Sequence, residues 1–315
     1  MRLVISLFCL TLTASQLFAQ SVSEVVHFDH QGTQRSYYIH LPAARDGPMP
    51  LFVLLHGMGG SAEKLRYGLG FNERANQQGF AVLYPQGQAL ADGSSHWNAG
   101  LSFSDVDDTG FLSDLIADVV KAHGLSARQV YVIGISNGGF MAYHLACSGR
   151  IELAGIASVI GTMPARDWNS CRPRGSVDLL HIHGVHDPLV PYHGGQSWTE
   201  PHVTLHPVPE VVRFWASGMP DMVALTDQRP LHLDGISDPE RLDITSYTAH
   251  HSNRRAALIT IGGFGHDWPF VEQTGLSTTD AIVGFFLRKP RPADINARQA
   301  RLAKPLEPRR AAHQR

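Results

Sequence analysis

The sequence has few cysteines and no long apolar segment. Only three cysteines occur in 315 residues, at Cys9, Cys147 and Cys171, which is too few for a fold built from disulfides or for a zinc or iron–sulfur site held by cysteine. The longest apolar run is about half of the roughly 20 residues that cross a bilayer, so we expect no stable membrane insertion. Apolar residues make up 43% and charged residues 17%, a composition that excludes a wholly disordered chain.

Motifs for metal ions, nucleotides and nucleic acids are also missing. Histidines at 181, 183 and 186 cluster in the sequence, but no His-Glu-x-x-His helix accompanies them, and we expect no metal. The glycines after residue 55 are not followed by Gly-Lys-Ser/Thr, and the dinucleotide spacing is absent, so no cofactor is expected. The net charge is -2, and without a recognition motif this argues against a nucleic-acid partner.

The chain divides into three regions. Residues 1–19 combine a short positive end, the apolar run Leu3 to Leu12 and a small residue, Ala19. This pattern predicts a signal peptide cleaved after Ala19, and hence a secreted or periplasmic protein; a buried first strand or an uncleaved anchor is the alternative. Residues 20–287 would form the catalytic domain, and residues 288–315 a basic tail.

The tail has the composition of an unstructured extension. It carries nine Lys/Arg against two acidic residues, with four prolines and almost no large apolar side chain, so burial cannot offset its ordering entropy. We expect a disordered segment that is merely solvated, or one that makes electrostatic contact with an acidic surface.

Cleavage of the signal would leave Cys147 and Cys171 as the two cysteines of the mature chain. Pairs of thiols tend to close in an oxidising compartment, so we predict one disulfide between them. Two buried thiols are the alternative.

The periodicity predicts an α/β fold. Two segments around Gln31-Gly32 favour an opening antiparallel hairpin. Short, nearly continuous apolar runs are typical of strands buried on both faces, and helical patterns separate several of them. This alternation implies a mostly parallel, doubly wound sheet. The predicted strands are 51–55, 81–84, 130–133, 156–160, 179–183 and 256–261, and the predicted helices are 62–77, 107–120 and 138–147.

A serine motif follows the strand that ends at Ile133. Residues 134–138 read Gly-Ile-Ser-Asn-Gly, the G-x-S-x-G nucleophile elbow, between a predicted strand and a predicted helix. The glycines leave room for a sharp turn that exposes Ser136. Ser136 is therefore the candidate nucleophile, and a serine that only caps the helix is the alternative.

A serine nucleophile needs a base and an orienting acid, and both have candidates downstream. Asp187 follows the strand 179–183, where such sheets place their sites, although it could instead form a turn before Pro188. His266 lies in a glycine-rich loop after the strand 256–261 and is the candidate base. The weaker candidates are His202, His206, His250 and His251 as base, and Asp107, Asp108 and Asp267 as acid.

The segment after the strand 51–55 can supply an oxyanion hole. It reads His-Gly-Met-Gly-Gly from His56, and we expect the amide of Met58 to act together with the amide of Asn137.

Seven segments together resemble a group of secreted esterases that contains poly(3-hydroxybutyrate) depolymerases and feruloyl esterases. They are 54–57, 84–87, 97–100, 106–112, the elbow, 181–192 and 266–269. The resemblance covers residues 25–287 and implies an α/β-hydrolase fold, a Ser136, Asp187 and His266 triad, oxyanion donors at Met58 and Asn137, and a substrate pocket near Trp97 and Trp268. It also fits a disulfide between Cys147 and Cys171.

The resemblance implies a serine esterase that acts on carboxylic esters, either polyhydroxyalkanoate oligomers or feruloyl and acetyl-type esters. The extra cysteines that many members carry are missing. An appended polymer-binding domain is missing as well, and this second absence argues against attack on crystalline polyester. Asp267 stands where threonine is usual. A peptidase of the same fold and a non-catalytic surface-binding protein remain alternatives. Trp97 and Trp268 would contact substrate or serve as ordinary core aromatics.

Overall fold

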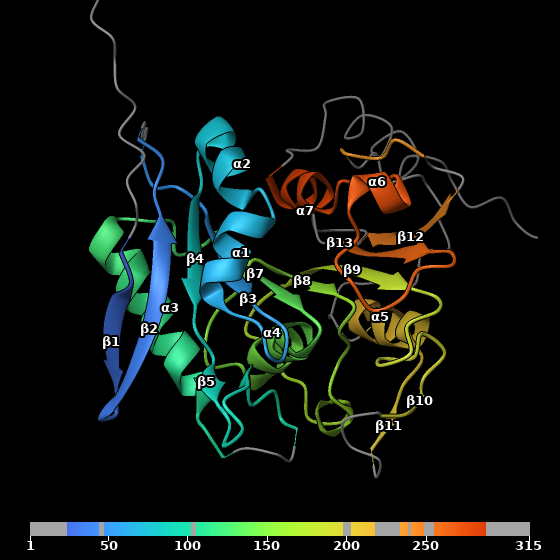
Figure 1. Cartoon of the computed structure of the whole chain (residues 1–315), viewed down its shortest axis with the longest axis horizontal. Coiled ribbons are helices and arrows are strands. Elements are labelled where there is room, and N and C mark those ends of the chain that lie inside the picture. Colours follow the sequence, from blue (N-terminus) through green and yellow to red (C-terminus); the bar gives the residue numbers. More distant parts are fainter. Residues whose placement is uncertain are drawn as a thin grey trace, which may run out of the picture.

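A nine-stranded sheet forms the centre of the molecule in a computed structural model (Figure 1). The structure describes residues 24–43, 47–101, 105–197, 203–217, 234–238, 241–248 and 255–287. The predicted signal peptide and basic tail lie outside these residues. In spatial order the strands are β1 (Val26–His30), β2 (Thr33–His40), β4 (Ala81–Pro85), β3 (Leu51–Leu55), β7 (Val130–Ile135), β8 (Gly155–Val159), β9 (Asp178–Gly184), β13 (Arg255–Ile261) and β12 (Leu242–Thr248).

The six strands from β4 to β13 run parallel, as the sequence predicts. Antiparallel pairs close both edges: β1 and β2 form the predicted N-terminal hairpin, and β12 pairs with β13. Parallel strands present all their carboxyl ends at one edge, where α/β sheets place their functional loops.

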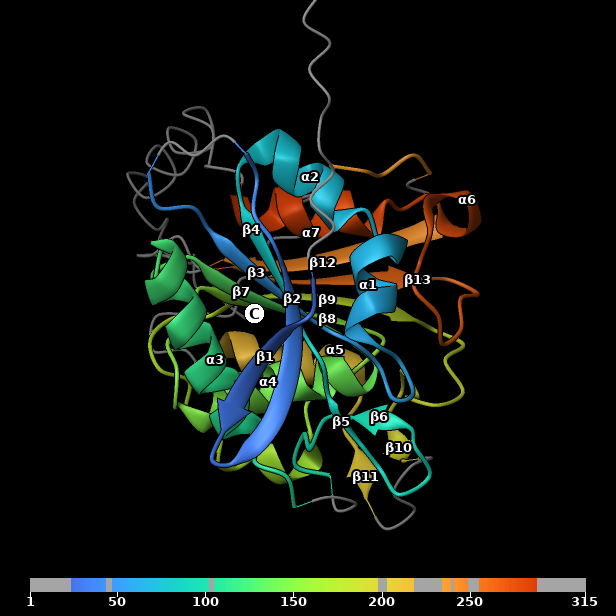
Figure 2. The same ribbon diagram turned by 60° about the vertical axis from the view of Figure 1, so that its left-hand side comes forward.

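Helices cover both faces of the sheet (Figure 2). Strand β3 shows why: Leu51, Val53 and Leu55 face one apolar cluster, and Phe52 and Leu54 face the other, because successive side chains alternate across a strand. On the first face lie α3 (Asp108–His123), α4 (Asn137–Ser148) and α5 (Val208–Ser217), and on the second lie α1 (Ala62–Gly68), α2 (Phe71–Gln78) and α7 (Thr278–Leu287). This architecture is the α/β-hydrolase fold.

The helix predicted over residues 62–77 is in fact two helices. Gly70 has a φ of 71° and separates α1 from α2, because glycine enters the left-handed region at little cost. Four short strands and two short helices complete the described elements: β5 (Gln88–Ala89), β6 (Ser95–His96), β10 (Gly195–Gln196), β11 (Thr204–Leu205), the 3-10 turn Ala165–Asp167 and α6 (Val271–Thr274).

A disulfide joins Cys147 to Cys171, as predicted. It ties the last turn of α4 to the segment after the turn Ala165–Asp167. Within the described part of the chain, none of the helices combines the length and the apolar character that crossing a membrane requires.

Candidate active site

The three candidate catalytic residues follow three strands of the parallel sheet. Ser136 comes after β7, Asp187 three residues after β9, and His266 five residues after β13. Strand β8 separates β7 from β9, and β13 is the next neighbour of β9. Residues far apart in the sequence therefore meet at the carboxyl edge of the sheet.

The backbone at Ser136 is strained, as a nucleophile elbow requires. Its φ is 52° and its ψ is -116°, a backbone conformation that residues other than glycine rarely adopt. A Cβ on Gly134 would lie 1.9 Å from the carbonyl oxygen of Gly138, and one on Gly138 would lie 2.3 Å from that of Leu55. Only glycine at these two positions lets the neighbouring backbone segments come so close.

Ser136 occupies the N-cap position of α4, but its side chain makes no capping hydrogen bond. Its Oγ lies 2.8 Å from Nε2 of His266 instead. This geometry disfavours the alternative in which the serine only caps a helix.

His266 connects the serine to the acid. Its Nδ1 lies 2.7 Å from Oδ2 of Asp187. Because a carboxylate only accepts, Nδ1 carries the hydrogen in this contact, and Nε2 of the neutral ring is left to accept from the hydroxyl of Ser136. The side chain of Asp187 is buried, whereas that of His266 retains 14% exposure, so the ring borders solvent.

Asp187 is surrounded by hydrogen-bond donors. Its Oδ1 accepts from the amides of Leu189 and Val190 at 2.9 and 2.8 Å, and Nε2 of His183 lies 3.4 Å from Oδ2. Burial alone would raise the pKa of Asp187, but hydrogen bonds from His183, His266 and Val190 outweigh burial and hold that pKa well below its usual range. Asp187 is therefore a carboxylate throughout the neutral range.

The loops that carry Asp187 and His266 are joined by their backbones. The amide of His186 donates to the carbonyl of Phe264 at 2.9 Å. A Cβ on Gly184 would lie 2.3 Å from that same carbonyl oxygen, so glycine is needed where the two loops touch. This contact holds the loop of Asp187 against the loop of His266.

The segment predicted to form an oxyanion hole lies against the elbow. A Cβ on Gly57 would sit 3.4 Å from the Cβ of Ser136, and the side chain of Met58 is 41% exposed. Asn137 opens α4, and the first amides of a helix have no partner within it. Both predicted donor residues therefore belong to segments adjacent to the serine.

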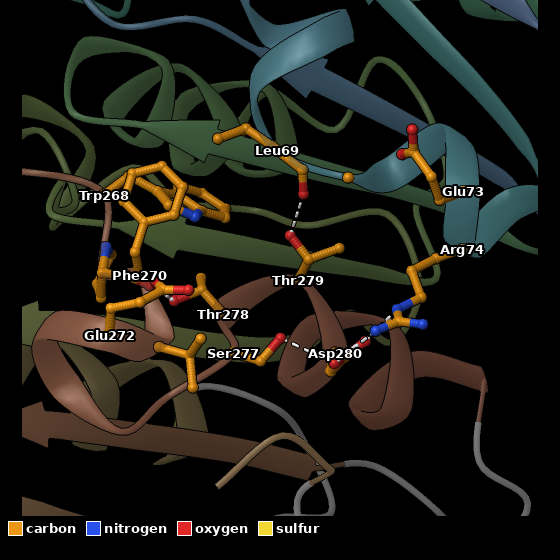
Figure 3. A pocket seen from close by; sticks show the side chains of 13 residues that line it. Leu69, Glu73, Arg74, Trp268, Phe270, Glu272, Ser277, Thr278, Thr279 and Asp280 are labelled. Carbon is orange, nitrogen blue, oxygen red and sulfur yellow. Dashed lines mark hydrogen bonds and ion pairs between the residues drawn. The ribbon is translucent and has the colours of Figure 1, made fainter. Parts of the chain in front are cut away.

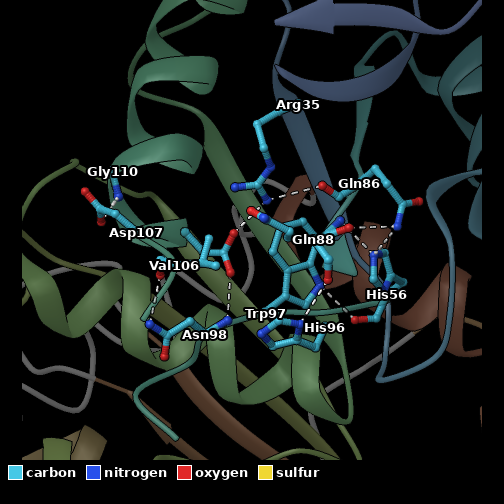
Figure 4. A network of polar contacts seen from close by, with 12 residues as sticks. Arg35, His56, Gln86, Gln88, His96, Trp97, Asn98, Val106, Asp107 and Gly110 are labelled. Atoms are coloured by element: carbon cyan, nitrogen blue, oxygen red, sulfur yellow. Dashed lines mark hydrogen bonds and ion pairs between the residues drawn. The ribbon is translucent and has the colours of Figure 1, made fainter. Parts of the chain in front are cut away.

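Trp97 holds Asn137 in place. The amide of Trp97 donates to Oδ1 of Asn137 at 2.7 Å, and Nδ2 of Asn137 donates to the carbonyl of Trp97 at 3.0 Å. The indole N–H of Trp97 donates to the carbonyl of His56 at 2.9 Å. One tryptophan thus links both predicted oxyanion segments, as part of a polar network (Figure 4).

His56 holds the oxyanion segment 56–60 in place through both nitrogens of its ring. Its Nδ1 lies 2.8 Å from the carbonyl of Gly57 and donates to it, and its Nε2 accepts from the amide of Gly87 at 2.9 Å. Burial lowers the pKa of His56 to about 4, although the hydrogen bond to Gly57 opposes the shift and the nearby His96 adds to it. The ring is therefore neutral at pH 7.

The two predicted substrate-binding tryptophans differ in their surroundings. Trp97 is fully buried, and its contacts with Asn137 and His56 favour the core-aromatic alternative. Trp268 is 6% exposed and lines a cavity of about 280 Å³ between the α1–α2 connection and the segment before α7 (Figure 3). The ion pair of Arg74 and Asp280 lies at the other end of this cavity.

The weaker candidates have other partners or lie outside the described residues. Asp107 caps α3 by accepting from the amide of Gly110 at 2.8 Å, and buried Asp108 pairs with Arg35 at 2.6 Å. Asp267 accepts from the amide of Trp268. His206 stacks on Trp168, whereas His202, His250 and His251 are outside the described residues.

The sequence analysis gives no role to Tyr143, His181 or His183, which form a hydrogen-bonded row that ends at Asp187. The sequence does indicate that His181 and His183 lie on the same face of the sheet, because they are two residues apart on one predicted strand. The partner on α4, Tyr143, could not be found from spacing.

The chain is similar in sequence to known esterases. The family model described as Esterase PHB depolymerase matches residues 35–163. NocK from Nocardia uniformis subsp. tsuyamanensis, which carries the name of an esterase, is 31% identical over 285 residues, covering 81% of this chain and 80% of NocK. Feruloyl esterase B of Piromyces equi is 27% identical over 154 residues, and the match covers 48% of this chain and 28% of that relative's length.

A solved structure supports the fold. The acetyl xylan esterase from Aspergillus awamori superposes with a TM-score of 0.54 at 15% identity, covering 84% of this chain and 98% of that one. At this identity the likeness concerns the fold alone.

Proposed function

We propose that this chain, which belongs to the Esterase PHB depolymerase family and is a carboxylic ester hydrolase, works through an acyl-enzyme on Ser136. The observation that carries the proposal is the hydrogen-bonded row Ser136, His266 and Asp187 at a strained strand-to-helix turn. The sequence offers these residues in the order nucleophile, acid, base, which is the order of α/β-hydrolases.

Acylation begins with proton transfer from Ser136. Its hydroxyl lies 2.8 Å from Nε2 of His266, so the imidazole accepts the proton as Oγ attacks the ester carbonyl. The carboxylate of Asp187 stabilises the resulting imidazolium. His266 then donates the proton to the departing alcohol oxygen, and the acyl group remains on Ser136.

Deacylation repeats these steps with water. His266 takes a proton from the attacking water and returns it to Oγ of Ser136, which releases the carboxylic acid. In both tetrahedral intermediates the negative oxygen would accept hydrogen bonds from the amides of Met58 and Asn137. The partial positive charge at the N-terminus of α4 adds to this stabilisation.

The proposed substrates are esters with small or aromatic acyl groups, of the feruloyl or acetyl type, or oligomers of a hydroxyalkanoate. The family name and the name of the feruloyl esterase relative support this range. Trp268, two residues after His266 in the sequence, is the proposed aromatic contact for the substrate. The cavity that it lines is bordered by none of Ser136, Asp187 and His266, so the proposal rests on its place in the chain. Trp97 would act by positioning Asn137.

An ester panel tests the proposal. Purified chain should hydrolyse p-nitrophenyl acetate, methyl ferulate and a 3-hydroxybutyrate dimer to different extents, and Ser136→Ala should lose at least about 10³-fold in kcat on each. Cleavage of a dipeptide amide in preference to all three esters would favour a peptidase. Equal inertness of wild type and Ser136→Ala would leave only a binding role.

Export of the mature chain is a separate proposal. It rests on the signal-like residues 1–19, and it divides the chain into a signal, a catalytic domain over 20–287 and a basic tail over 288–315 that makes at most electrostatic surface contacts. N-terminal sequencing of protein from the culture medium or periplasm should begin at Gln20. Protein that retains Met1 in the cytoplasmic fraction would contradict it.

A further inference from the structure

A buried row of polar side chains leads from the core to Asp187, and the steps above do not use it. Tyr143 on α4 and His181 and His183 on β9 are all fully buried. The hydroxyl of Tyr143 lies 2.8 Å from Nδ1 of His181, and Nε2 of His181 lies 3.1 Å from Nδ1 of His183. Nε2 of His183 is 2.8 Å from the carbonyl of Val190 and 3.4 Å from Oδ2 of Asp187.

The end of this row fixes the direction of every hydrogen bond in it. A carbonyl and a carboxylate only accept, so Nε2 of His183 must carry a hydrogen. In a neutral ring Nδ1 then accepts, and its donor is Nε2–H of His181. The remaining nitrogen of His181 accepts from the hydroxyl of Tyr143. All three hydrogens therefore run in one direction, from Tyr143 to the carbonyl of Val190, with Oδ2 of Asp187 3.4 Å from the last nitrogen.

The buried location favours a neutral ring in His181. Burial lowers the pKa of His181 well below its ordinary value, with a smaller contribution from His183, and burial raises the pKa of Tyr143. A protonated His183 would place a cation 3.4 Å from the carboxylate oxygen that His266 also contacts. That cation would compete with the imidazolium that must form on His266 during catalysis.

We propose that Tyr143, His181 and His183 form a tautomer lock that positions the catalytic acid. The hydroxyl of Tyr143 selects the tautomer of His181, and His181 selects that of His183. The N–H of His183 then holds the carbonyl of Val190 and one oxygen of Asp187. This inference rests on the proposed function, because the lock acts on the reaction only if Asp187 orients the base.

The lock matters because the opposite tautomer of His183 would be repelled by the oxygens that it faces. With the hydrogen on Nδ1, the lone pair of Nε2 in His183 would face the carbonyl of Val190 and the carboxylate of Asp187. The amide of Val190 also donates to Oδ1 of Asp187 at 2.8 Å, so displacing Val190 would loosen the carboxylate from both sides. The three residues of the tautomer lock are positioning residues that act through Asp187.

Kinetics with p-nitrophenyl acetate test the lock with a matched control. Tyr143→Phe removes one buried hydroxyl and should lower kcat about five-fold, with KM unchanged. Tyr84→Phe is the control, because the hydroxyl of fully buried Tyr84 also makes a 2.8 Å hydrogen bond, to Asn72, in a different part of the core. It should leave kcat unchanged. Equal kcat values for the two variants would overturn the proposal.

A double-variant cycle separates the lock from general packing. His183→Leu should lower kcat about 30-fold, and His183→Gln should retain more activity because its amide keeps a donor near the position of Nε2. Adding Tyr143→Phe to His183→Leu should cost nothing further, since the hydroxyl acts through His183. Fully additive losses would contradict the lock.

The tautomers themselves can be observed without any assay of activity. Nitrogen-15 NMR of the histidine-labelled full chain, with signals assigned by their loss in His183→Gln, should show hydrogen on Nε2 of His183 and none on Nδ1. Hydrogen on Nδ1 would overturn the lock even in a fully active enzyme. If the ester panel failed but this tautomer were found, the proposed function would fall and the hydrogen-bond assignment would stand.

Discussion

The two oxygens of the Asp187 carboxylate accept hydrogen bonds from different partners. Oδ1 accepts from two backbone amides, and Oδ2 receives His266 at 2.7 Å and His183 at 3.4 Å. An amide in its place could offer only one acceptor oxygen. If that oxygen kept the two backbone donors, the NH₂ group would face Nδ1 of His266.

Asp187→Asn should therefore favour the wrong tautomer of His266. With Nδ1 forced to accept, Nε2 of His266 would carry a hydrogen and could no longer take the proton of Ser136. We expect kcat on p-nitrophenyl acetate at neutral pH to fall on the order of 10⁴-fold. Thermal unfolding of the variant serves as the control for folding, and a folded variant with less than a ten-fold loss would contradict this role of Asp187.

His56 predicts how stability depends on pH. Its pKa of about 4 in the folded state lies below the ordinary 6.5, so the unfolded chain binds more protons between these values and the free energy of unfolding falls as pH falls. The contribution lost from pH 7 to pH 4 is about 3 kcal/mol. Urea unfolding should show the stability difference between wild type and His56→Gln shrinking by about this amount; an equal difference at both pH values would refute the assignment.

The sequence predicts much of the candidate site, because chemistry restricts which residue types can act together. Ser136, Asp187 and His266 were chosen by motif and order, and the structure brings them within hydrogen-bonding distance. The sequence does not decide whether Trp97 contacts substrate or lies in the core. A tryptophan suits a pocket and a core equally well, and only the fold shows what surrounds it.

Among the elements, the turn between β7 and α4 depends most strictly on glycine. Gly134→Ala would bring Cβ within 1.9 Å of a backbone oxygen, so the variant should lose about 3 kcal/mol or more of stability together with its activity. Gly68→Ala, in α1, is the matched control because a Cβ there meets nothing within 4 Å. It should be neutral or stabilising. Equal stability of the two variants by urea unfolding would contradict the crowding described at the elbow.

The disulfide between Cys147 and Cys171 stabilises the element that carries Ser136. The cysteines are 24 residues apart, and closing such a loop contributes about 3 to 4 kcal/mol on the chain-entropy model. Cys147→Ser/Cys171→Ser should therefore lower the midpoint of thermal unfolding by several degrees while retaining kcat at 25 °C. An unchanged midpoint would show that the bond adds nothing to stability.

Strands were easier to predict than the helices that cover them. The six buried parallel strands are continuous apolar runs, and each was found within about two residues of its ends. Helix 62–77 was predicted as one element because the apolar pattern continues across Gly70, whose φ of 71° breaks it. Strand β12 and helices α5 and α7 were not assigned, since short segments of mixed pattern do not identify an element by themselves.

For the whole molecule, the topology explains why the site forms at all. Ser136 and His266 are 130 residues apart in the sequence, and their meeting depends on parallel strands that deliver both loops to one edge of the sheet. The two antiparallel edge pairs and the helices on both faces bury this sheet. The sequence could predict the parallel sheet but not the strand order, because order is decided by packing between distant segments.

The candidate catalytic site is tested most directly by locating its reactive side chain chemically. Intact protein treated with a fluorophosphonate and mapped by peptide mass spectrometry should carry one adduct, on Ser136, and His266→Ala should label far more slowly. Hydrolysis of p-nitrophenyl acetate should cease when labelling is complete, at one fluorophosphonate per chain. An adduct on a different residue, or full hydrolysis by Ser136→Ala, would contradict the assignment of Ser136, His266 and Asp187 as the catalytic site.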